Sequence, residues 1–256
     1  MGKTIAVFGC GFVGGTVADF LMASGINVIK IDPKYYPTND PMDAIFDSDG
    51  IIICVPTPPY SDGSCDDSIV KEILSMCDYR TKILVKSTVT PDNIQHYDTN
   101  VIYNPEFLRE EHARDDFANQ NVQIFGHHDH NIEDAHWWAD LFSECHKQDI
   151  ETIFTNRRTA SMIKYTHNAF LATKVAWFHE LYANLPPEVD YNTLINSLGC
   201  FKRIGKSHMQ APNSQGKLGY GGACFPKDVK ALTNILDHSI LKYVDKVNTN
   251  FGEKND

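Results

Sequence analysis

Long hydrophobic runs and an excess of basic residues are both missing from this chain. No apolar stretch approaches the length of about 18 residues that a membrane-spanning helix requires. Only 23 lysines and arginines stand against 33 aspartates and glutamates, and the resulting net charge of −10 repels a phosphate backbone. The opening sequence MGKTIAVFG also lacks the basic and apolar regions of a signal peptide. We therefore expect a cytoplasmic protein that binds neither membranes nor nucleic acid.

Paired cysteines are missing as well. The seven cysteines include no CxxC pair, which argues against disulfides and against a structural zinc site. The histidines at positions 127, 128 and 130 have no matching ligand cluster, so we expect no metal. Most of the thiols are expected to be small buried side chains. Cys224 differs from the others because glycines, a lysine and an aspartate surround it.

The N-terminal part of the chain alternates strand-like runs with amphipathic segments. Residues 4–9 are typical of a buried strand, a helical pattern follows and ends at Gly25, and residues 26–32 resemble a second strand. Further apolar runs begin at Ile51, Lys82 and Asn100. Strands buried on both faces of a parallel sheet have this pattern. We predict an α/β domain over residues 1–155, with a doubly wound parallel sheet.

From residue 156 onward the hydrophobic pattern becomes helical. The longest helical periodicity covers residues 159–185, and another helix is expected after the proline pair at 186 and 187. A polar, glycine-rich stretch runs from Lys202 to Gly222, and a last helical segment begins at Asp228. Residues 156–256 are therefore predicted to form a helical second region.

A GxGxxG motif lies between the first predicted strand and the first predicted helix. Gly9, Gly11 and Gly14 permit a tight turn and let a pyrophosphate approach the N–H groups at the helix N-terminus. Asp32 stands 18 residues beyond Gly14, at the end of the second strand. Its carboxylate can accept hydrogen bonds from an adenosine ribose and repel a 2′-phosphate. The motif therefore predicts NAD as the cofactor in preference to NADP.

Five further segments resemble the UDP-glucose/GDP-mannose dehydrogenase family, and they occur in the family's order. They are CVPTPPYSDGSCD from Cys54, KSTVTP from Lys86, NPEFLREEHA from Asn104, the helix that carries Lys164 and Asn168, and GYGGACFPKD from Gly219. The resemblance runs from Lys3 to about Asn250. It implies a Rossmann-like NAD domain, followed by a helical region for substrate binding and dimerisation. The implied reaction is the NAD-dependent oxidation of a nucleotide sugar at C6, through an aldehyde to an acid.

Cys224 resembles the nucleophile of that family. An aldehyde has no hydride to give directly to a second NAD+, whereas addition of a thiolate produces a thiohemiacetal that can be oxidised to a thioester. A neighbouring cation such as Lys227 would favour the thiolate. The resemblance itself places Lys227 against the cofactor.

Lys164 and Asn168 lie four residues apart, so both project from one face of a helix. The resemblance implies that they polarise the reacting oxygen, where an ammonium ion stabilises developing negative charge. β-Hydroxyacid dehydrogenases share this pair, which therefore indicates dehydrogenation without fixing the substrate. By the same resemblance, Thr88 and Asp228 position the catalytic water, and Glu106 assists hydrolysis of the thioester.

The resemblance also implies the remaining contacts of the site. The cofactor contacts are Phe12, Val13, Thr57, Ser87, Glu110 and Lys227. The substrate contacts are Glu106, Phe107, Leu108, Lys164, Asn168, Arg203, Tyr220 and Gly221. Of these, Arg203 resembles an arginine that reaches the sugar nucleotide of a neighbouring subunit, which predicts a homodimer.

The chain departs from the family pattern in three places, the first of which is the segment between Asp32 and Ile51, which is shorter than usual. Ser161 replaces an acidic residue three positions before the helix lysine. Family members usually continue through a long central helix into a second domain that binds the uridine diphosphate, so we expect the final segment to be a shortened form of that helix. Oxidation of UDP-glucose is the first hypothesis. Oxidation of GDP-mannose or UDP-N-acetylmannosamine stays open, as does an impaired NAD-binding protein or a partial subunit that needs a partner domain.

Overall fold

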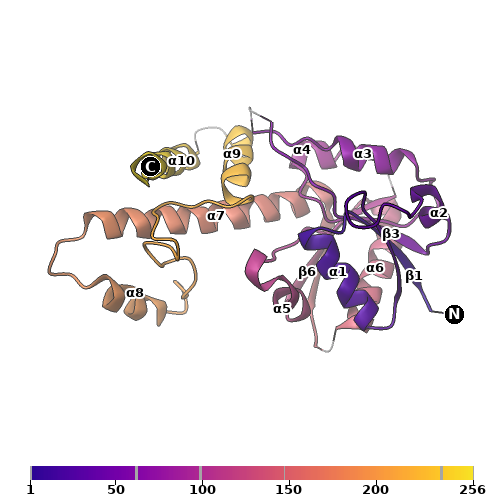
Figure 1. The fold of residues 1–256 in the computed structure, drawn as a ribbon, viewed down its shortest axis with the longest axis horizontal. Helices are drawn as coiled ribbons and strands as arrows, with labels where there is room; N and C mark the ends of the chain where they lie inside the picture. The colour runs from indigo at the N-terminus through magenta and orange to yellow at the C-terminus, as the bar shows by residue number, and fades with distance from the viewer. Residues whose placement is uncertain (1, 61–62, 98–99, 147, 237–238, 256) are drawn as a thin grey trace. The chain divides into compact units, whose positions relative to one another are not determined.

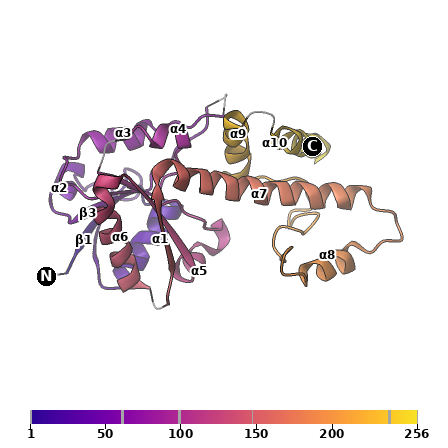
Figure 2. The same ribbon diagram turned by 180° about the vertical axis from the view of Figure 1, so that it is seen from behind.

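The structure is a computed structural model, and it divides the chain into two compact units. It describes residues 2–60, 63–97, 100–146, 148–236 and 239–255. The first unit comprises Met1–Tyr60 and Ser64–Lys164, and the second comprises Ser61–Gly63 and Tyr165–Asp256. Figures 1 and 2 show the elements of each unit from opposite sides.

A seven-stranded sheet forms the centre of the first unit among the described residues, in the order β2-β1-β3-β4-β5-β6-β7. The parallel strands are β1 (Thr4–Phe8), β2 (Asn27–Ile31), β3 (Gly50–Ile53), β4 (Ile83–Val85) and β5 (Val101–Tyr103). Strand β6 (Val122–His127) runs antiparallel to β5, and β7 (Glu151–Asn156) runs parallel to β6. The predicted doubly wound sheet is confirmed. The antiparallel pair and strand β7 differ from the expected all-parallel arrangement.

Helices cover both faces of the sheet because alternate side chains of each central strand point to opposite sides. In β3, Ile51 and Ile53 join one buried cluster and Ile52 joins the other. The cluster around Ile52 is completed by α1 (Phe12–Ala23), α5 (Ala113–Ala118) and α6 (Ile132–Cys145). The opposite cluster is completed by α2 (Pro41–Phe46), α3 (Ser68–Ser75) and α4 (Pro91–Ile94).

The first turn of helix α7 (Arg157–Asn184) is anchored to the first unit by a buried arginine. The guanidinium of Arg157 donates to the carbonyl of Tyr97 at 2.9 Å and to Nε2 of His128 at 2.5 Å. Because Nε2 accepts this bond, the imidazole of His128 is neutral. Burial and the neighbouring Arg157 charge both lower the pKa of His128. The anchor fixes the start of the helix on which Lys164 lies.

The second unit is helical, as predicted. It contains most of α7, together with α8 (Tyr191–Gly199), α9 (Phe225–Ile235) and α10 (Leu241–Asn255). Its core includes Phe178 of α7, Tyr191 and Ile195 of α8, and Met209 and Ala211 of the loop that follows. No helix in the described ranges is long and apolar enough to cross a membrane.

The final segment forms two helices, so the expectation of a single shortened helix was wrong. Leu236 at the end of α9 adopts an extended backbone, with φ −100° and ψ 115°. The hydroxyl of Ser239 then accepts a hydrogen bond from the N–H of Leu241 at 3.1 Å. A serine that accepts from an N–H at a helix start caps a new helix, and α10 therefore begins there.

Candidate active site

The glycine loop joins β1 to α1 in the first unit. A Cβ at Gly9 would lie 2.7 Å from the carbonyl oxygen of Cys54, and a Cβ at Gly14 would lie 1.8 Å from the carbonyl oxygen of Gly9. The protein's own packing therefore requires glycine at both positions. A Cβ at Gly11 would meet no described atom within 4 Å, and no side chain caps the start of α1 there. The loop thus fits the pyrophosphate of NAD, which needs close approach to uncapped N–H groups.

Asp32 lies beside this loop, where the spacing predicted it. Its Oδ2 accepts a hydrogen bond from the N–H of Cys10 at 2.8 Å, and its Oδ1 accepts from the N–H of Lys34 at 2.8 Å. Each carboxylate oxygen has two lone pairs. Asp32 therefore holds the glycine loop against β2 and keeps capacity to accept a ribose hydroxyl.

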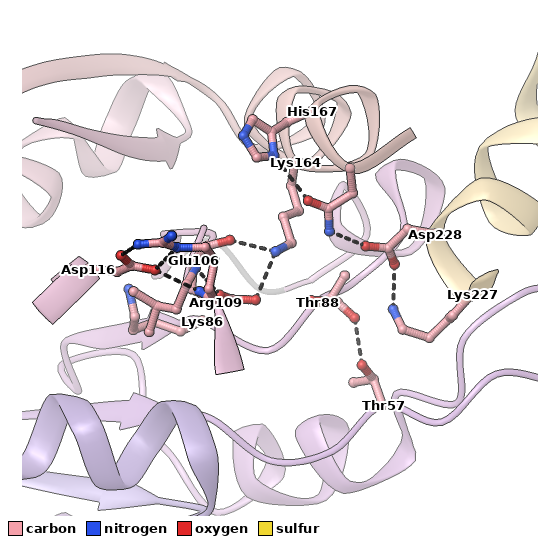
Figure 3. A network of polar contacts seen from close by, with 12 residues as sticks. Thr57, Lys86, Thr88, Glu106, Arg109, Asp116, Lys164, His167, Lys227 and Asp228 are labelled. Atoms are coloured by element: carbon pink, nitrogen blue, oxygen red, sulfur yellow. Dashed lines mark hydrogen bonds and ion pairs between the residues drawn. The ribbon is translucent and has the colours of Figure 1, made fainter. Parts of the chain in front are cut away.

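The predicted cofactor residues after β3 and β4 connect the carboxyl ends of those strands. The hydroxyl of Thr57 donates to the carbonyl oxygen of Thr88 at 2.7 Å, as Figure 3 shows. The hydroxyl of Ser87 donates to the carbonyl oxygen of Val55 at 2.7 Å. Open α/β sheets bind their ligands outside the carboxyl ends of the strands. These bonds therefore fix two loops at the edge of the sheet where a dinucleotide is expected.

A buried ion pair joins Lys164 to Glu106 (Figure 3). The Lys164 ammonium lies 2.6 Å from the Glu106 carbonyl oxygen and 2.8 Å from its Oε1, and the side chains are only 3% and 7% exposed. Burial by itself raises the pKa of Glu106, but the charge and hydrogen bond of Lys164 outweigh it, so the pKa is lowered. Glu106 is therefore ionised. An ammonium has three N–H donors, and the two bonds to Glu106 use two of them.

The segments that follow Glu106 complete this part of the site. The N–H of Leu108 donates to Oε2 of Glu106 at 2.7 Å, and the Phe107 ring lies 5.5 Å from the Lys164 nitrogen. Ser161, the departure from the family pattern, donates its hydroxyl to the carbonyl oxygen of Val89 at 2.6 Å. Ser161 therefore holds α7 against the loop after β4 through a backbone bond.

Lys86 is a second buried lysine, to which the sequence assigned no role. Its ammonium donates to Oδ1 of Asn104 at 2.6 Å, and Asn104 donates in turn to the carbonyl oxygen of Ile124 at 2.8 Å. Burial lowers the pKa of Lys86 to about 8, although the negative charge of Glu106 acts in the opposite direction. The sequence feature that could have indicated a buried lysine is its position directly after the apolar run ILV.

In the second unit, Asp228 links two predicted site residues (Figure 3). The Asn168 amide donates to Oδ2 of Asp228 at 2.7 Å, and the Lys227 ammonium donates to Oδ1 at 2.6 Å. Asp228 is 1% exposed. Because Lys227 bonds to this carboxylate, its charge is not reserved for the thiol of Cys224.

Cys224 is the N-cap of α9 and is exposed, unlike most of the cysteines. The N-terminus of a helix carries partial positive charge, which favours a thiolate. Helix α9 has eleven residues and begins directly after this cysteine. The thiol therefore lies at the end of α9 that carries the partial positive charge.

The other predicted substrate residues are dispersed over the second unit. The N–H of Tyr220 donates to Oδ1 of Asn248 at 2.6 Å, and burial raises the pKa of the Tyr220 phenol. Gly221 and Arg203 are exposed on loops. The side chain of Glu110 lies outside the described part of the structure.

Comparison with known proteins gives two matches to models of one family. The NAD-binding domain of the UDP-glucose/GDP-mannose dehydrogenase family matches residues 33–146, and the central domain of the same family matches residues 158–250. The two ranges follow one another along the chain. They include the segments that carry Glu106, Lys164 and Cys224.

Individual relatives agree with these matches. UDP-glucose 6-dehydrogenase of Rickettsia bellii is 34% identical over 209 residues, which are 76% of this chain and 46% of that protein. A putative UDP-glucose 6-dehydrogenase of Bacillus subtilis is 29% identical, over 89% of this chain and 62% of that protein. The solved structure of a UDP-glucose dehydrogenase from Pyrobaculum islandicum has a TM-score of 0.83 at 25% identity, covering 98% of this chain and 68% of that one. The chain thus spans less than two thirds of the length of these two sequence relatives.

Proposed function

This chain belongs to the UDP-glucose/GDP-mannose dehydrogenase family, and we propose that it oxidises a nucleotide sugar at C6, with UDP-glucose as the first candidate substrate. The buried pair of Lys164 and Glu106 is the observation that carries this proposal, because the third N–H of the ammonium would donate to the reacting oxygen. The similarity to UDP-glucose 6-dehydrogenases supports the choice of substrate. Formation of two NADH for each UDP-glucose consumed is the direct test.

The first oxidation converts the C6 alcohol to an aldehyde. As the hydroxyl passes its proton to water, negative charge develops on the oxygen, and preorganised donors stabilise such charge. Lys164 supplies the ammonium, and Asn168, one helical turn later, supplies an amide whose orientation is fixed by Asp228. NAD+, when held at the glycine loop, would supply the hydride acceptor for both oxidations.

The second oxidation converts the aldehyde to an acid through a covalent intermediate on Cys224. The thiolate adds to the C6 carbonyl carbon and leaves the negative charge on the oxygen of the resulting thiohemiacetal, where the Lys164 ammonium would stabilise it. Departure of the hydride from C6 leaves a thioester. Water adds to the thioester carbon, releasing the carboxylic acid and restoring the thiol. For this step we propose that the carboxylates of Glu106 and Asp228 orient the water, together with Thr88.

We expect the protein to prefer NAD+ to NADP+ and Asp32→Ala to narrow that preference. The carboxylate would accept hydrogen bonds from the ribose and would repel the extra phosphate, and hydrogen bonds to a charged group contribute about 1.5–3 kcal/mol. The variant should therefore lose roughly tenfold to a hundredfold in NAD+ affinity. Calorimetric titration with both cofactors measures the ratio. Asp43 is an exposed carboxylate of α2, and its replacement by alanine should leave the ratio of NAD+ to NADP+ affinity unchanged. Equal affinities of the wild type for NAD+ and NADP+ would contradict the role of Asp32.

A homodimer is also proposed, and the exposed surface of α7 adds a second reason for it to the one that Arg203 gave. The apolar residues of α9 and α10, such as Val229 and Val247, are buried within the chain. Large apolar side chains are instead exposed on α7, where Phe170 is 68% and Trp177 is 60% exposed. These two residues are seven positions apart, so they lie on the same side of the helix.

Sedimentation velocity is expected to show twice the chain mass of 28.9 kDa at micromolar concentration. A Phe170→Glu/Trp177→Glu double variant should sediment as a monomer, because burying two carboxylates in an apolar interface is unfavourable. Tyr79→Glu, at an exposed site of the first unit, should remain dimeric. A wild-type monomer at micromolar concentration would rule the dimer out.

A further inference from the structure

His179 is buried in α7, and its ring connects two separate points of the glycine-rich loop. Nε2 lies 2.9 Å from the carbonyl oxygen of Gln210, and the N–H of Gly219 donates to Nδ1 at 2.7 Å. A carbonyl can only accept and an N–H can only donate, so the ring must carry its proton on Nε2 and a lone pair on Nδ1. Burial lowers the pKa of His179, which favours the same neutral form.

Gly219 is held on its other side by α10. Its φ is +90°, and a Cβ added there would lie 2.7 Å from Oδ1 of Asn248. The same Asn248 oxygen accepts a hydrogen bond from the N–H of Tyr220 at 2.6 Å. Gly219 is therefore fixed between a histidine of α7 and an asparagine of α10, five residues before Cys224.

Other side chains hold the earlier part of the loop. The Tyr191 hydroxyl of α8 donates to the carbonyl oxygen of Met209 at 2.7 Å, and the Lys174 ammonium donates to the carbonyl oxygen of Ile204 at 2.8 Å. These contacts precede Gln210 in the chain. His179 differs from them because its ring reaches both the start and the end of the segment from Gln210 to Gly219.

From this geometry we propose that His179 is a positioning residue for the nucleophile Cys224. The ring fixes Gly219 to α7, the helix that also carries Asn168. Loop movement at Gly219 would displace the start of α9 and with it the thiol at the N-cap. His179 bonds to backbone groups of the loop and to no reacting atom, so it acts through the loop. The proposal rests on the oxidation proposed above only where a kinetic measurement is used.

Three substitutions separate the two bonds of the ring. In His179→Asn, the side-chain oxygen stands near the place of Nδ1 and can accept from Gly219, but the side chain does not reach Gln210. In His179→Gln, the amide nitrogen stands near the place of Nε2 and can donate to Gln210. His179→Ala removes both bonds. Asn184→Ala is the matched control, because Asn184 lies at the exposed end of the same helix and donates to the carbonyl of Glu180, one turn earlier.

Hydrogen exchange at the Gly219 amide, followed by mass spectrometry on overlapping peptides, tests the positioning without any turnover. Loss of one buried hydrogen bond should accelerate exchange by about tenfold or more in His179→Ala and His179→Gln. His179→Asn and Asn184→Ala should remain near the wild-type rate. If His179→Ala is poorly folded, the difference in Gly219 exchange rate between His179→Asn and His179→Gln is sufficient to test the proposal. Equal Gly219 exchange in these two variants would overturn the proposal.

Kinetics supply the second readout. We expect the kcat for acid formation to fall by about tenfold in His179→Gln and to be restored largely in His179→Asn, with NAD+ affinity unchanged in both. A merely structural role would reduce both variants alike or change cofactor affinity as well, and either result would overturn the proposal. Should the wild type oxidise no nucleotide sugar, the proposed function fails, and the exchange measurement still decides whether His179 positions the loop.

Discussion

Replacing Cys224 with serine is expected to reduce the yield of acid by roughly a thousandfold or more, since removal of a nucleophile has effects of this size in covalent catalysis. A serine alkoxide is much harder to form than a thiolate, and an ester is harder to turn over than a thioester. The wild-type thiol is exposed at the N-cap of α9, and a thiol is far more acidic than the hydroxyl that would replace it. Aldehyde or a trapped ester should accumulate in place of acid.

The matched control for this variant is Cys200→Ser. Cys200 is also exposed and lies at the end of α8, so its loss should leave the acid yield within about twofold of wild type, as surface substitutions usually do. NAD+ binding should survive in both variants because the glycine loop belongs to the first unit. An unchanged acid yield in Cys224→Ser would remove this thiol from the mechanism while leaving a dehydrogenase.

Lys164→Met is expected to lower kcat for the first oxidation by about a hundredfold to a thousandfold, which is typical when one donor to a developing oxyanion is lost. The variant also leaves the Glu106 carboxylate buried without its partner, at a cost of about 3–5 kcal/mol of stability. In the wild type, the ion pair lowers the pKa of Glu106, so its stabilisation is present at neutral pH and is lost as the pH falls through that pKa. In the variant, burial would raise the pKa instead. The stability deficit should then be largest at neutral pH and shrink on acidification.

A double variant, Lys164→Met/Glu106→Gln, separates activity from stability. It should recover much of the melting temperature, because the Glu106 carboxylate no longer lies buried without the Lys164 ammonium, and it should stay inactive. Arg158→Ala is the control on the same helix: Arg158 pairs with Asp92 at the surface, and such pairs contribute at most about 1 kcal/mol. Wild-type turnover by the double variant would show that Lys164 does not stabilise the reacting oxygen.

The central part of the fold could be predicted because its strands are buried on both faces. The residues of β1 and β3 are almost wholly buried apolar side chains, and their runs stand out in the sequence. Strand β7 gave no such signal, since its residues are exposed or half-buried. It becomes a strand by pairing with β6 along its whole length. The antiparallel direction of β6 likewise depends on the edge at which the chain returns to the sheet. The local hydrophobic pattern of a strand does not indicate that edge.

Some positions in the candidate site could likewise be predicted from the sequence, whereas others could not. The position of Asp32 beside the glycine loop followed from spacing along one β-α-β unit. The bond between Lys164 and Glu106 joins residues 58 positions apart, and only the resemblance to a family placed them together. His179 could not be found at all, because it bonds to backbone groups, and backbone groups leave no pattern of residue types. The resemblance placed Lys227 against the cofactor and the sequence placed it near the thiol, but only side-chain geometry shows that its ammonium donates to Asp228.

The most direct measurement is the stoichiometry of NADH formation with UDP-glucose, with product identified by mass spectrometry. Substrate should reach millimolar concentration, so that weak binding does not conceal turnover. A panel containing GDP-mannose and UDP-N-acetylmannosamine, run in parallel, identifies the preferred sugar. We expect two NADH for each UDP-glucose consumed, together with the corresponding uronic acid. Binding of NAD+ without NADH formation from any nucleotide sugar would contradict the proposed oxidation and favour an NAD-binding protein that needs a partner domain.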